Sequence, residues 1–170
     1  DFYQLLNSNT IIYSPTLKAF VNKKTLQERY KVSAENFCLV KSIAGDQSDN
    51  IPGVRGLSYK TIAKMIPDTT SSHELTLDEF FDKAKEIHKI KNTKSTKRLV
   101  FGEMLVRRNW RLIRLDTNNL NFEHIKKINT IFESEKGVKD KLSMLRYLMK
   151  LGINTLNIDG LYLSLQSLTR

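Results

Sequence analysis

Apolar residues recur three and four positions apart along most of this chain, which is the spacing of a helix with one buried face. One such segment follows Ser33 and stops at Gly45, and another follows Ser58 and stops before Pro67. Serine favours helix N-termini, whereas glycine and proline end helices, so these residues predict both helices. Further helices are expected over residues 25–30 with Thr25 as the cap, and over residues 77–90, 97–108, 122–132, 139–151 and 158–168.

Extended structure is predicted only near the start of the chain. Residues 10–14 and 17–21 are rich in β-forming residues and flank Ser14-Pro15-Thr16, an arrangement typical of a short hairpin. Residues 110–115 alternate basic and apolar side chains before a turn expected at residues 116–119. The pattern shows no internal repeat and therefore predicts a single, mainly α chain.

Size and composition narrow the class of protein. The chain has 170 residues, of which 40% are hydrophobic, with only seven glycines and three prolines. This composition excludes a disordered or collagen-like chain and predicts one domain, or one domain with a small appendage. The single cysteine, Cys38, excludes an intrachain disulfide framework and a multi-cysteine zinc site. Its apolar helical setting predicts a buried side chain, and we expect Trp110 to be a core residue rather than a base-stacking one.

No apolar stretch approaches the roughly 18 residues of a membrane helix, and no charged and apolar leader precedes a cleavage site. We therefore expect a soluble, cytoplasmic protein with no membrane partner. The first residue is Asp1 rather than methionine, so we also expect a fragment or a processed product.

The charge of the chain points to a polyanionic partner. There are 28 Lys and Arg residues against 18 Asp and Glu residues, which gives a net charge of +10. Eleven basic residues and two acidic ones lie between Lys83 and Arg114. A solvated helix face is one interpretation of this stretch, but such faces usually mix signs and form ion pairs. We favour phosphate contact, and nucleic acid over an anionic membrane surface, because basic clusters gain affinity by releasing counterions from nucleic acid.

Two carboxylates follow the predicted helix that ends at Gly45. Asp46 and Asp49 are three residues apart, so one turn could direct both toward the same site. Hard oxygen ligands of this kind suit Mg²⁺ or Mn²⁺. Turn formation and capping are the alternative role, since Asp and Asn are common at helix ends for that reason alone.

The next residues, Gly53-Val54-Arg55-Gly56, form a glycine turn between two predicted helices. Glycine allows a sharp turn and a close approach to a ligand, and backbone N–H groups at the start of the following helix can face an anion. An ordinary helical corner would also use two glycines. As a phosphate clamp, the turn would bind backbone without sequence preference. Its candidate DNA-binding residues are Gly53, Val54, Arg55, Gly56, Ser58, Lys60 and Lys64.

The run GDQSDNIPGVRGLSYKTIAKMI, residues 45–66, resembles the helix-hairpin-helix, or helix-three-turn-helix, signature of the 5′ nucleases. These include phage 5′–3′ exonucleases, the 5′-nuclease domain of bacterial DNA polymerase I, and flap endonucleases. The chain departs from the family pattern at Ser58, where the family has glycine, and at Ile62, where it usually has alanine. Residues 1–6 are similar to the end of the family's stretch of metal-binding aspartates, and residues 108–116 more weakly resemble a phage segment that starts at Asn109.

The resemblance implies a site for two divalent ions, Mg²⁺ or Mn²⁺, with Asp1, Asp46 and Asp49 among the direct or water-mediated ligands. It also implies K⁺ at the hairpin, phosphate contacts by Lys60 and Arg55, and branched or 5′-ended duplex DNA as the partner. Replication proteins are further candidate partners, and a monomer is expected. A phage-encoded protein would act in the host cytoplasm.

The resemblance further implies a mainly α fold: a helix-hairpin-helix (SAM-like) DNA-binding region with a short β-hairpin that is the remnant of an α/β nuclease core. Residues 1–24 would form the edge of that core, residues 25–67 the DNA-binding region, and residues 68–170 a helical C-terminal region. The chain is then the C-terminal half of a phage-type 5′–3′ exonuclease or flap endonuclease. The family's other ligands lie upstream, so we expect the fragment alone to be inactive or nearly so.

Two other functions remain open from the sequence. The same clamp could serve a stand-alone, non-catalytic DNA-binding module that recognises no particular sequence. An RNA-binding or structural protein is the third alternative, and it predicts that Asp46→Asn leaves divalent-ion binding unchanged. The sequence leaves open the choice between flap and exonuclease substrates.

Overall fold

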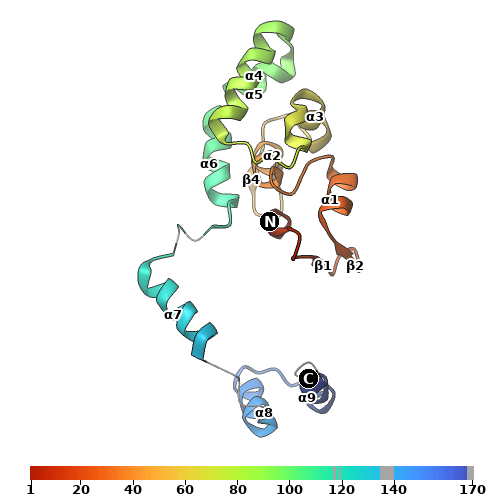
Figure 1. Ribbon diagram of the computed structural model, residues 1–170, viewed down its shortest axis with the longest axis vertical. Coiled ribbons are helices and arrows are strands. Elements are labelled where there is room, and N and C mark those ends of the chain that lie inside the picture. The colour runs from red at the N-terminus through yellow and green to blue at the C-terminus, as the bar shows by residue number, and fades with distance from the viewer. Residues whose placement is uncertain (117, 119, 135–139, 168–170) are drawn as a thin grey trace. The chain divides into compact units, whose positions relative to one another are not determined.

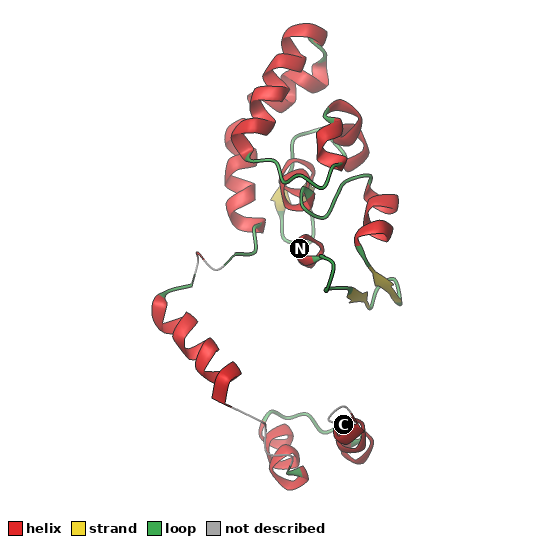
Figure 2. Ribbon diagram, viewed as in Figure 1, coloured by secondary structure: helices red, strands yellow, loops and turns green. Residues whose placement is uncertain are grey.

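The computed structural model describes residues 1–116, 118, 120–134 and 140–167. The chain divides into two compact units, Asp1–Asp116 and Thr117–Arg170, each of which is described by itself. Helices dominate both units, and the strands lie in the first (Figures 1 and 2). The predicted mainly α fold with a short β-hairpin is therefore confirmed.

The first unit begins with a 3₁₀ turn, η1 (Phe2–Leu5), and a β-hairpin of β1 (Ile12–Ser14) and β2 (Ala19–Val21). The two strands are antiparallel and pair Ile12 with Val21, within the two segments for which the sequence predicts a hairpin. The hairpin leads into α1 (Lys23–Tyr30). These elements share a small core, made of the buried residues Leu6, Val21, Leu26, Ala34 and Phe37 with Tyr3 and Tyr30 packed against it.

The predicted cap of α1 is wrong by three residues. Asn22 is the N-cap, and its side chain accepts a hydrogen bond from the Thr25 N–H at 3.0 Å. Thr25 Oγ1 in turn accepts the Asn22 N–H at 2.9 Å, which completes a capping box. Asparagine and threonine are both good caps, and the reciprocal bonding places the start of the helix before Thr25.

The central part of the first unit is α2 (Phe37–Ala44), the short strands β3 (Gly45–Asp46) and β4 (Ile51–Pro52), and α3 (Tyr59–Met65). A second 3₁₀ turn, η2 (Pro67–Thr70), follows. Ser58 caps α3 as predicted, accepting the Thr61 N–H. At α2 the predicted Ser33 bonds Asn36, and the helix begins one residue after Asn36.

Three further helices complete the first unit: α4 (Leu77–Lys91), α5 (Lys94–Phe101) and α6 (Glu103–Ile113). The single helix predicted over residues 97–108 is wrong, because the structure has two helices that meet at Gly102. The second of them, α6, extends past residue 108 and ends at Ile113, within the segment of alternating basic and apolar residues. A Cβ atom on Gly102 would lie 2.8 Å from Cγ2 of Val54. The break therefore lets α5 and α6 approach the turn that contains Val54.

These helices enclose the main core. Its largest buried side chains are Phe80 and Phe81 of α4, which pack against α2, α3, α5 and α6 residues. Cys38 is buried as predicted, at 2% exposure, and burial raises its pKa to about 11. Trp110 corrects a prediction, because it is only half-buried and lies beneath the Arg114 guanidinium, 5.2 Å from the ring centre, outside the core clusters.

The second unit contains α7 (Phe122–Ser134), α8 (Lys141–Lys150) and α9 (Ile158–Ser167). Asp140 caps α8 by accepting the N–H groups of Leu142 and Ser143. Lys141 and Asp159 form an ion pair that joins α8 to α9. The predicted bounds Lys139 and Leu168, and residues 117 and 119 of the predicted turn, lie outside the described residues.

One buried polar side chain joins three elements of the first unit. Asn109 of α6 is fully buried, and its Nδ2 donates to the Ser42 carbonyl at 3.0 Å and to the Pro52 carbonyl at 2.8 Å. Ser42 belongs to α2 and Pro52 to β4. Asn109 therefore fixes the turn between α2 and α3 against α6, which gives a structural reason for asparagine at the start of the phage-like segment.

We expect Asn109→Leu to lower the free energy of unfolding by about 2–3 kcal/mol, because one buried and one partly buried carbonyl group each lose the hydrogen bond from Asn109. Leucine has nearly the same size, so lost packing contributes little. Urea denaturation followed by the fluorescence of Trp110, the single tryptophan, measures the change. Leu112→Ala on the same helix, where Leu112 is 64% exposed, is the control and should change stability little. Equal effects of the two substitutions would contradict this role of Asn109.

Candidate metal centre and phosphate-binding hairpin

The structure brings together the three carboxylates that the sequence singles out. One oxygen from each of Asp1, Asp46 and Asp49 lies within 4.8 Å of the others. Asp46 sits on β3, and the antiparallel pairing of Asp46 with Ile51 turns the chain back so that Asp49 lies in the connecting turn. Asp1 reaches the same place from just before η1. Residues that are far apart in sequence thus form one acidic cluster.

Lys41 lies at this cluster and was missed by the sequence analysis. Its Nζ is 2.6 Å from Oδ1 of Asp1 and 2.5 Å from Oδ2 of Asp46. The side chain is only 12% exposed. A signal was present, because Lys41 is the one charged residue in α2, whose other positions are mostly buried and apolar. A lysine in such a helix needs an acidic partner.

The electrostatics of the cluster favour the ionised forms. Burial opposes ionisation of Asp46, but hydrogen bonds from Lys41 and Ser48 outweigh it and lower the Asp46 pKa to about 2. Ser48 donates both its N–H, at 3.0 Å, and its hydroxyl, at 2.5 Å. Burial is again the largest single effect and opposes the charge on Lys41, but the hydrogen bond to Asp46 and the other favourable interactions of the cluster together outweigh it, so the Lys41 pKa is raised. The cluster therefore already holds one positive charge at neutral pH.

The turn after β4 packs closely against the end of α2. A Cβ atom on Gly53 would lie 2.2 Å from the Ala44 carbonyl oxygen, so only glycine fits there. The Val54 N–H donates to the Ile43 carbonyl at 2.7 Å, and the Val54 side chain is 7% exposed. Gly53 is thus required by packing, and the N–H group and side chain of Val54 are engaged within the fold. The DNA contacts expected of Gly53 and Val54 stay predictions.

The rest of the turn is open. Within the described part of the chain, the N–H groups of Arg55, Gly56 and Ser58 have no acceptor. A surface hollow of about 360 Å³ surrounds these residues and is lined by Ala44 and residues 53–58. Gly56 adopts φ +81°, a conformation that favours glycine. The helix that follows, α3, has seven residues, so the donors of this hairpin are its own amides rather than a long helix dipole.

Arg98 of α5 reaches the hairpin as well. Its Nη1 donates to the Arg55 carbonyl at 3.4 Å and lies 3.1 Å from the position of a Cβ on Gly56. In the sequence, Arg98 is one of eleven basic residues between positions 83 and 114, and nothing there assigns it to the hairpin. Its place at the hairpin depends on the break at Gly102, which no local pattern predicts.

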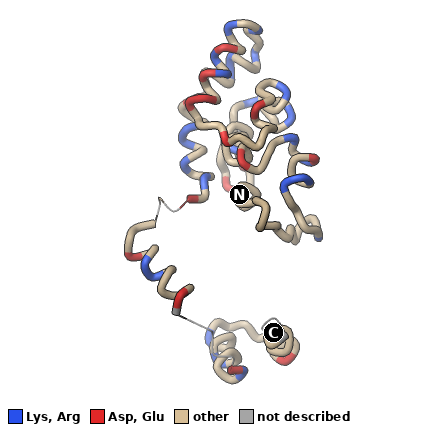
Figure 3. The backbone as a smooth tube through the Cα atoms, viewed as in Figure 1, with Lys and Arg blue, Asp and Glu red and all other residues tan. Residues whose placement is uncertain are grey.

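Four of those eleven basic residues form ion pairs within the first unit, so the stretch is not a uniform phosphate-binding face. The basic residues lie on several helices, interspersed with acidic ones (Figure 3). The pairs are Lys83 with Asp68, Lys85 with Glu103, Arg107 with Asp78 and Glu103, and Arg114 with Glu74. The solvated and paired interpretation therefore holds for part of this stretch.

The lowered pKa of Asp46 predicts how the stability of the fold depends on pH. The folded-state pKa of about 2 lies below the ordinary value of 3.8, so ionised Asp46 stabilises the fold above about pH 4, and this contribution is lost as the pH falls through 2. With metals chelated, Asp46→Asn should therefore destabilise the chain at pH 5 and progressively less toward pH 2. Urea titrations at several pH values test this, with exposed Asp82→Asn as the control. A difference between wild type and Asp46→Asn that does not change with pH would refute it.

No described helix is both long and apolar enough to cross a bilayer. No protein-family model matches the chain. The chain is 36% identical to a thermostable DNA polymerase I of Thermus filiformis over 75 residues, which are 44% of this chain and 9% of the relative. It is 32% identical over 81 residues to DNA polymerase I of Caldicellulosiruptor bescii, covering 44% of this chain and 10% of the relative.

DNA polymerase I of Deinococcus radiodurans is 31% identical over 68 residues, covering 40% of this chain and 7% of the relative. The chain thus aligns with about a tenth or less of the length of these relatives. The predicted resemblance is confirmed to this extent: the homologues of this chain are DNA polymerase I proteins, and the match is consistent with their 5′–3′ exonuclease region.

Proposed function

We propose that this chain is the C-terminal half of a structure-specific 5′–3′ exonuclease or flap endonuclease of phage type. Its homology to DNA polymerase I segments supports a function related to nucleic acid. The observation that carries the proposal is the convergence of Asp1 with Asp46 and Asp49, in a chain that continues through β4 to the open amides of Arg55, Gly56 and Ser58. In this proposal the turn binds the backbone of the duplex, and the carboxylates take part in hydrolysis of the phosphodiester bond.

The donor atoms of the acidic cluster fit a hard divalent cation such as Mg²⁺ or Mn²⁺. Carboxylate oxygens are the ligands such ions prefer, and three of them lie close enough to share one site. A bound ion supplies an activated water and stabilises charge on the phosphate during hydrolysis. Asp46 would be held in place by Ser48, whose two donors orient its carboxylate. Lys41 would balance the negative charge of the cluster.

The hairpin would bind phosphate through main-chain donors. Arg55, Gly56 and Ser58, whose N–H groups have no acceptor in the described part of the chain, line a hollow, and Lys60 is exposed two residues further on. Donors of this kind contact the backbone and leave the bases unread, so binding would not depend on sequence. The K⁺ ion implied at the hairpin also belongs to this proposal; the Val54 and Arg55 carbonyls each already accept one hydrogen bond.

The substrate proposed is branched or 5′-ended duplex DNA, encountered by a monomer in the cytoplasm. A second candidate is a DNA-binding module that does not catalyse. One observation favours it: Lys41 already pairs with two of the three carboxylates, so the cluster is partly neutralised without a metal ion. Metal binding separates the two candidates, because only the nuclease requires it.

Under the nuclease proposal, Mn²⁺ should raise the melting temperature of the chain by about 5 °C or more at a hundred times its Kd, because an ion that binds only the folded state stabilises it. Asp46→Asn and Asp49→Asn should each remove most of the shift, whereas exposed Asp82→Asn on α4 should keep it. Differential scanning calorimetry with Mn²⁺ and with chelator measures this. A melting temperature independent of Mn²⁺ would favour the second candidate.

Lys60→Gln should weaken binding to duplex DNA of any sequence and lower the slope of log K against log salt by about 0.9, the value for one lost phosphate contact. Fluorescence anisotropy over a range of salt concentrations provides both quantities. Lys18→Gln is the matched control, because Lys18 is also exposed and forms no ion pair in the described part of the chain. Loss that depended on DNA sequence, or equal slopes for the two variants, would argue against the phosphate role of Lys60.

A further inference from the structure

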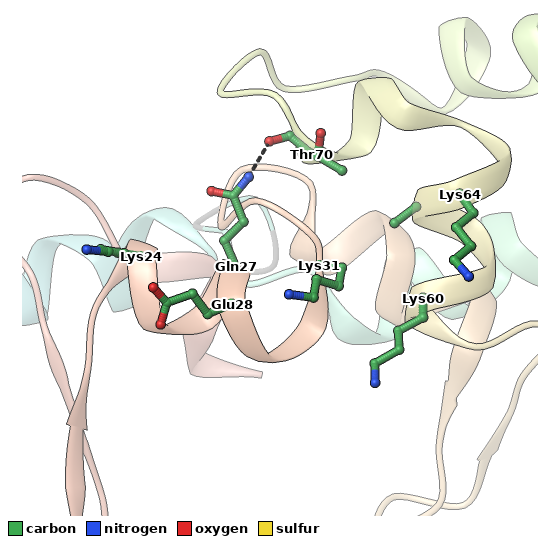
Figure 4. A pocket seen from close by; sticks show the side chains of 8 residues that line it. Lys24, Gln27, Glu28, Lys31, Lys60, Lys64 and Thr70 are labelled. Atoms are coloured by element: carbon green, nitrogen blue, oxygen red, sulfur yellow. Dashed lines mark hydrogen bonds between the residues drawn. The ribbon is translucent and has the colours of Figure 1, made fainter.

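A basic groove lies between α1 and α3. It has a volume of about 580 Å³ and is lined by four lysines. Lys24 lies in α1 and Lys31 is the residue that ends this helix, whereas Lys60 and Lys64 lie in α3. Glu28 is the one acidic residue among those that line it. Figure 4 shows Lys31 and Lys60 on facing elements, with Lys24 at the outer end of α1.

The four lysines lack acidic partners. None forms an ion pair within the part of the chain that the structure describes, and all four are exposed. Neighbouring lysines behave differently: Lys23 pairs with Glu35, and Lys41 pairs with two aspartates. Several unpaired positive charges around one groove repel each other and create a local positive potential, which an anionic ligand would neutralise.

The walls of the groove are fixed relative to each other. Gln27 of α1 donates from Nε2 to the carbonyl of Thr70, at the end of η2, at 2.8 Å. Lys31 ends α1 in a left-handed conformation, φ 63°, and its N–H bonds the Gln27 carbonyl. The hydrogen bond from Gln27 thus connects α1, with its lysines, to the 3₁₀ turn that follows α3.

The groove and the hairpin hollow are lined by neighbouring residues at the start of α3. Lys60 lines the groove and is two residues from Ser58, which lines the hollow at the hairpin. The groove offers separate ammonium groups on long stems, which contact phosphates as point charges. Separate charges along a groove match the repeated phosphates of a strand better than a single small anion.

We infer that the α1–α3 groove binds a second stretch of the sugar-phosphate backbone of the same duplex, with Lys24 and Lys31 as phosphate contacts. The inference rests on the proposed function, because it extends the DNA path that begins at the hairpin. It assigns a binding role to α1, a helix whose sequence carries no nucleic-acid motif.

The test is the salt dependence of duplex binding by the full chain. A fluorescently labelled duplex of mixed sequence is titrated with wild type, Lys60→Gln, the pair Lys24→Gln and Lys31→Gln, and a control pair, Lys18→Gln and Lys127→Gln. The control removes the same charge from two exposed lysines outside the groove that have no ion pair in the described residues. The groove pair should lower the slope of log K against log salt by about 1.8, and the control pair by much less. Unchanged melting temperatures show that both pairs fold.

A groove pair that matches the control pair, while Lys60→Gln still lowers the slope, overturns the inference and leaves the proposed function standing. A wild-type chain that does not bind duplex overturns both. A third arm adds inorganic phosphate without DNA. If phosphate raises the melting temperature of wild type but not of the groove pair, and the DNA slopes stay equal, the groove takes a small anion and the inference is wrong.

Discussion

The close packing of Gly53 on the carbonyl end of α2 is the constraint on which the rest of the site depends. With 2.2 Å between the Ala44 oxygen and the position of a Cβ, the chain can return to α2 only through glycine. The return is fixed by the Val54 N–H, which bonds Ile43, and by Asn109, which bonds Ser42 and Pro52. Asp46 and Asp49 come before this return in the chain, and the open amides of Arg55, Gly56 and Ser58 come after it.

Local features of the sequence predicted the parts that depend on local physics. Ser58 was identified as the cap of α3 because serine side chains accept from helix N-termini, and Cys38 as buried because of its apolar helix. Local patterns also predict the β-hairpin and the proximity of Asp46 and Asp49, which are three residues apart. The resemblance to 5′ nucleases added Asp1, which spacing alone does not connect to the others.

Other parts depend on contacts between elements and were missed. The break at Gly102 lets α5 and α6 approach Val54, a residue 48 positions earlier. Arg98 at the hairpin and Asn109 between three elements depend on that approach. Lys41 is the single charged residue of α2, and this position in an apolar helix is a signal that the sequence contains. Its two partners, Asp1 and Asp46, are seen only in the folded structure. Val54 packs inward, and the sequence does not reveal this because a turn residue that packs inward has the same sequence signature as one that faces a ligand.

The central claim is that the carboxylate cluster holds a divalent ion beside the hairpin. The most direct measurement is anomalous X-ray diffraction from crystals of this chain soaked in Mn²⁺. The account predicts an anomalous peak at about 2.0–2.3 Å from carboxylate oxygens of Asp46 or Asp49, or one water molecule away, with Lys41 displaced from at least one of its partners. Crystals that show no peak at the cluster, with Lys41 still bonded to Asp1 and Asp46, would contradict it.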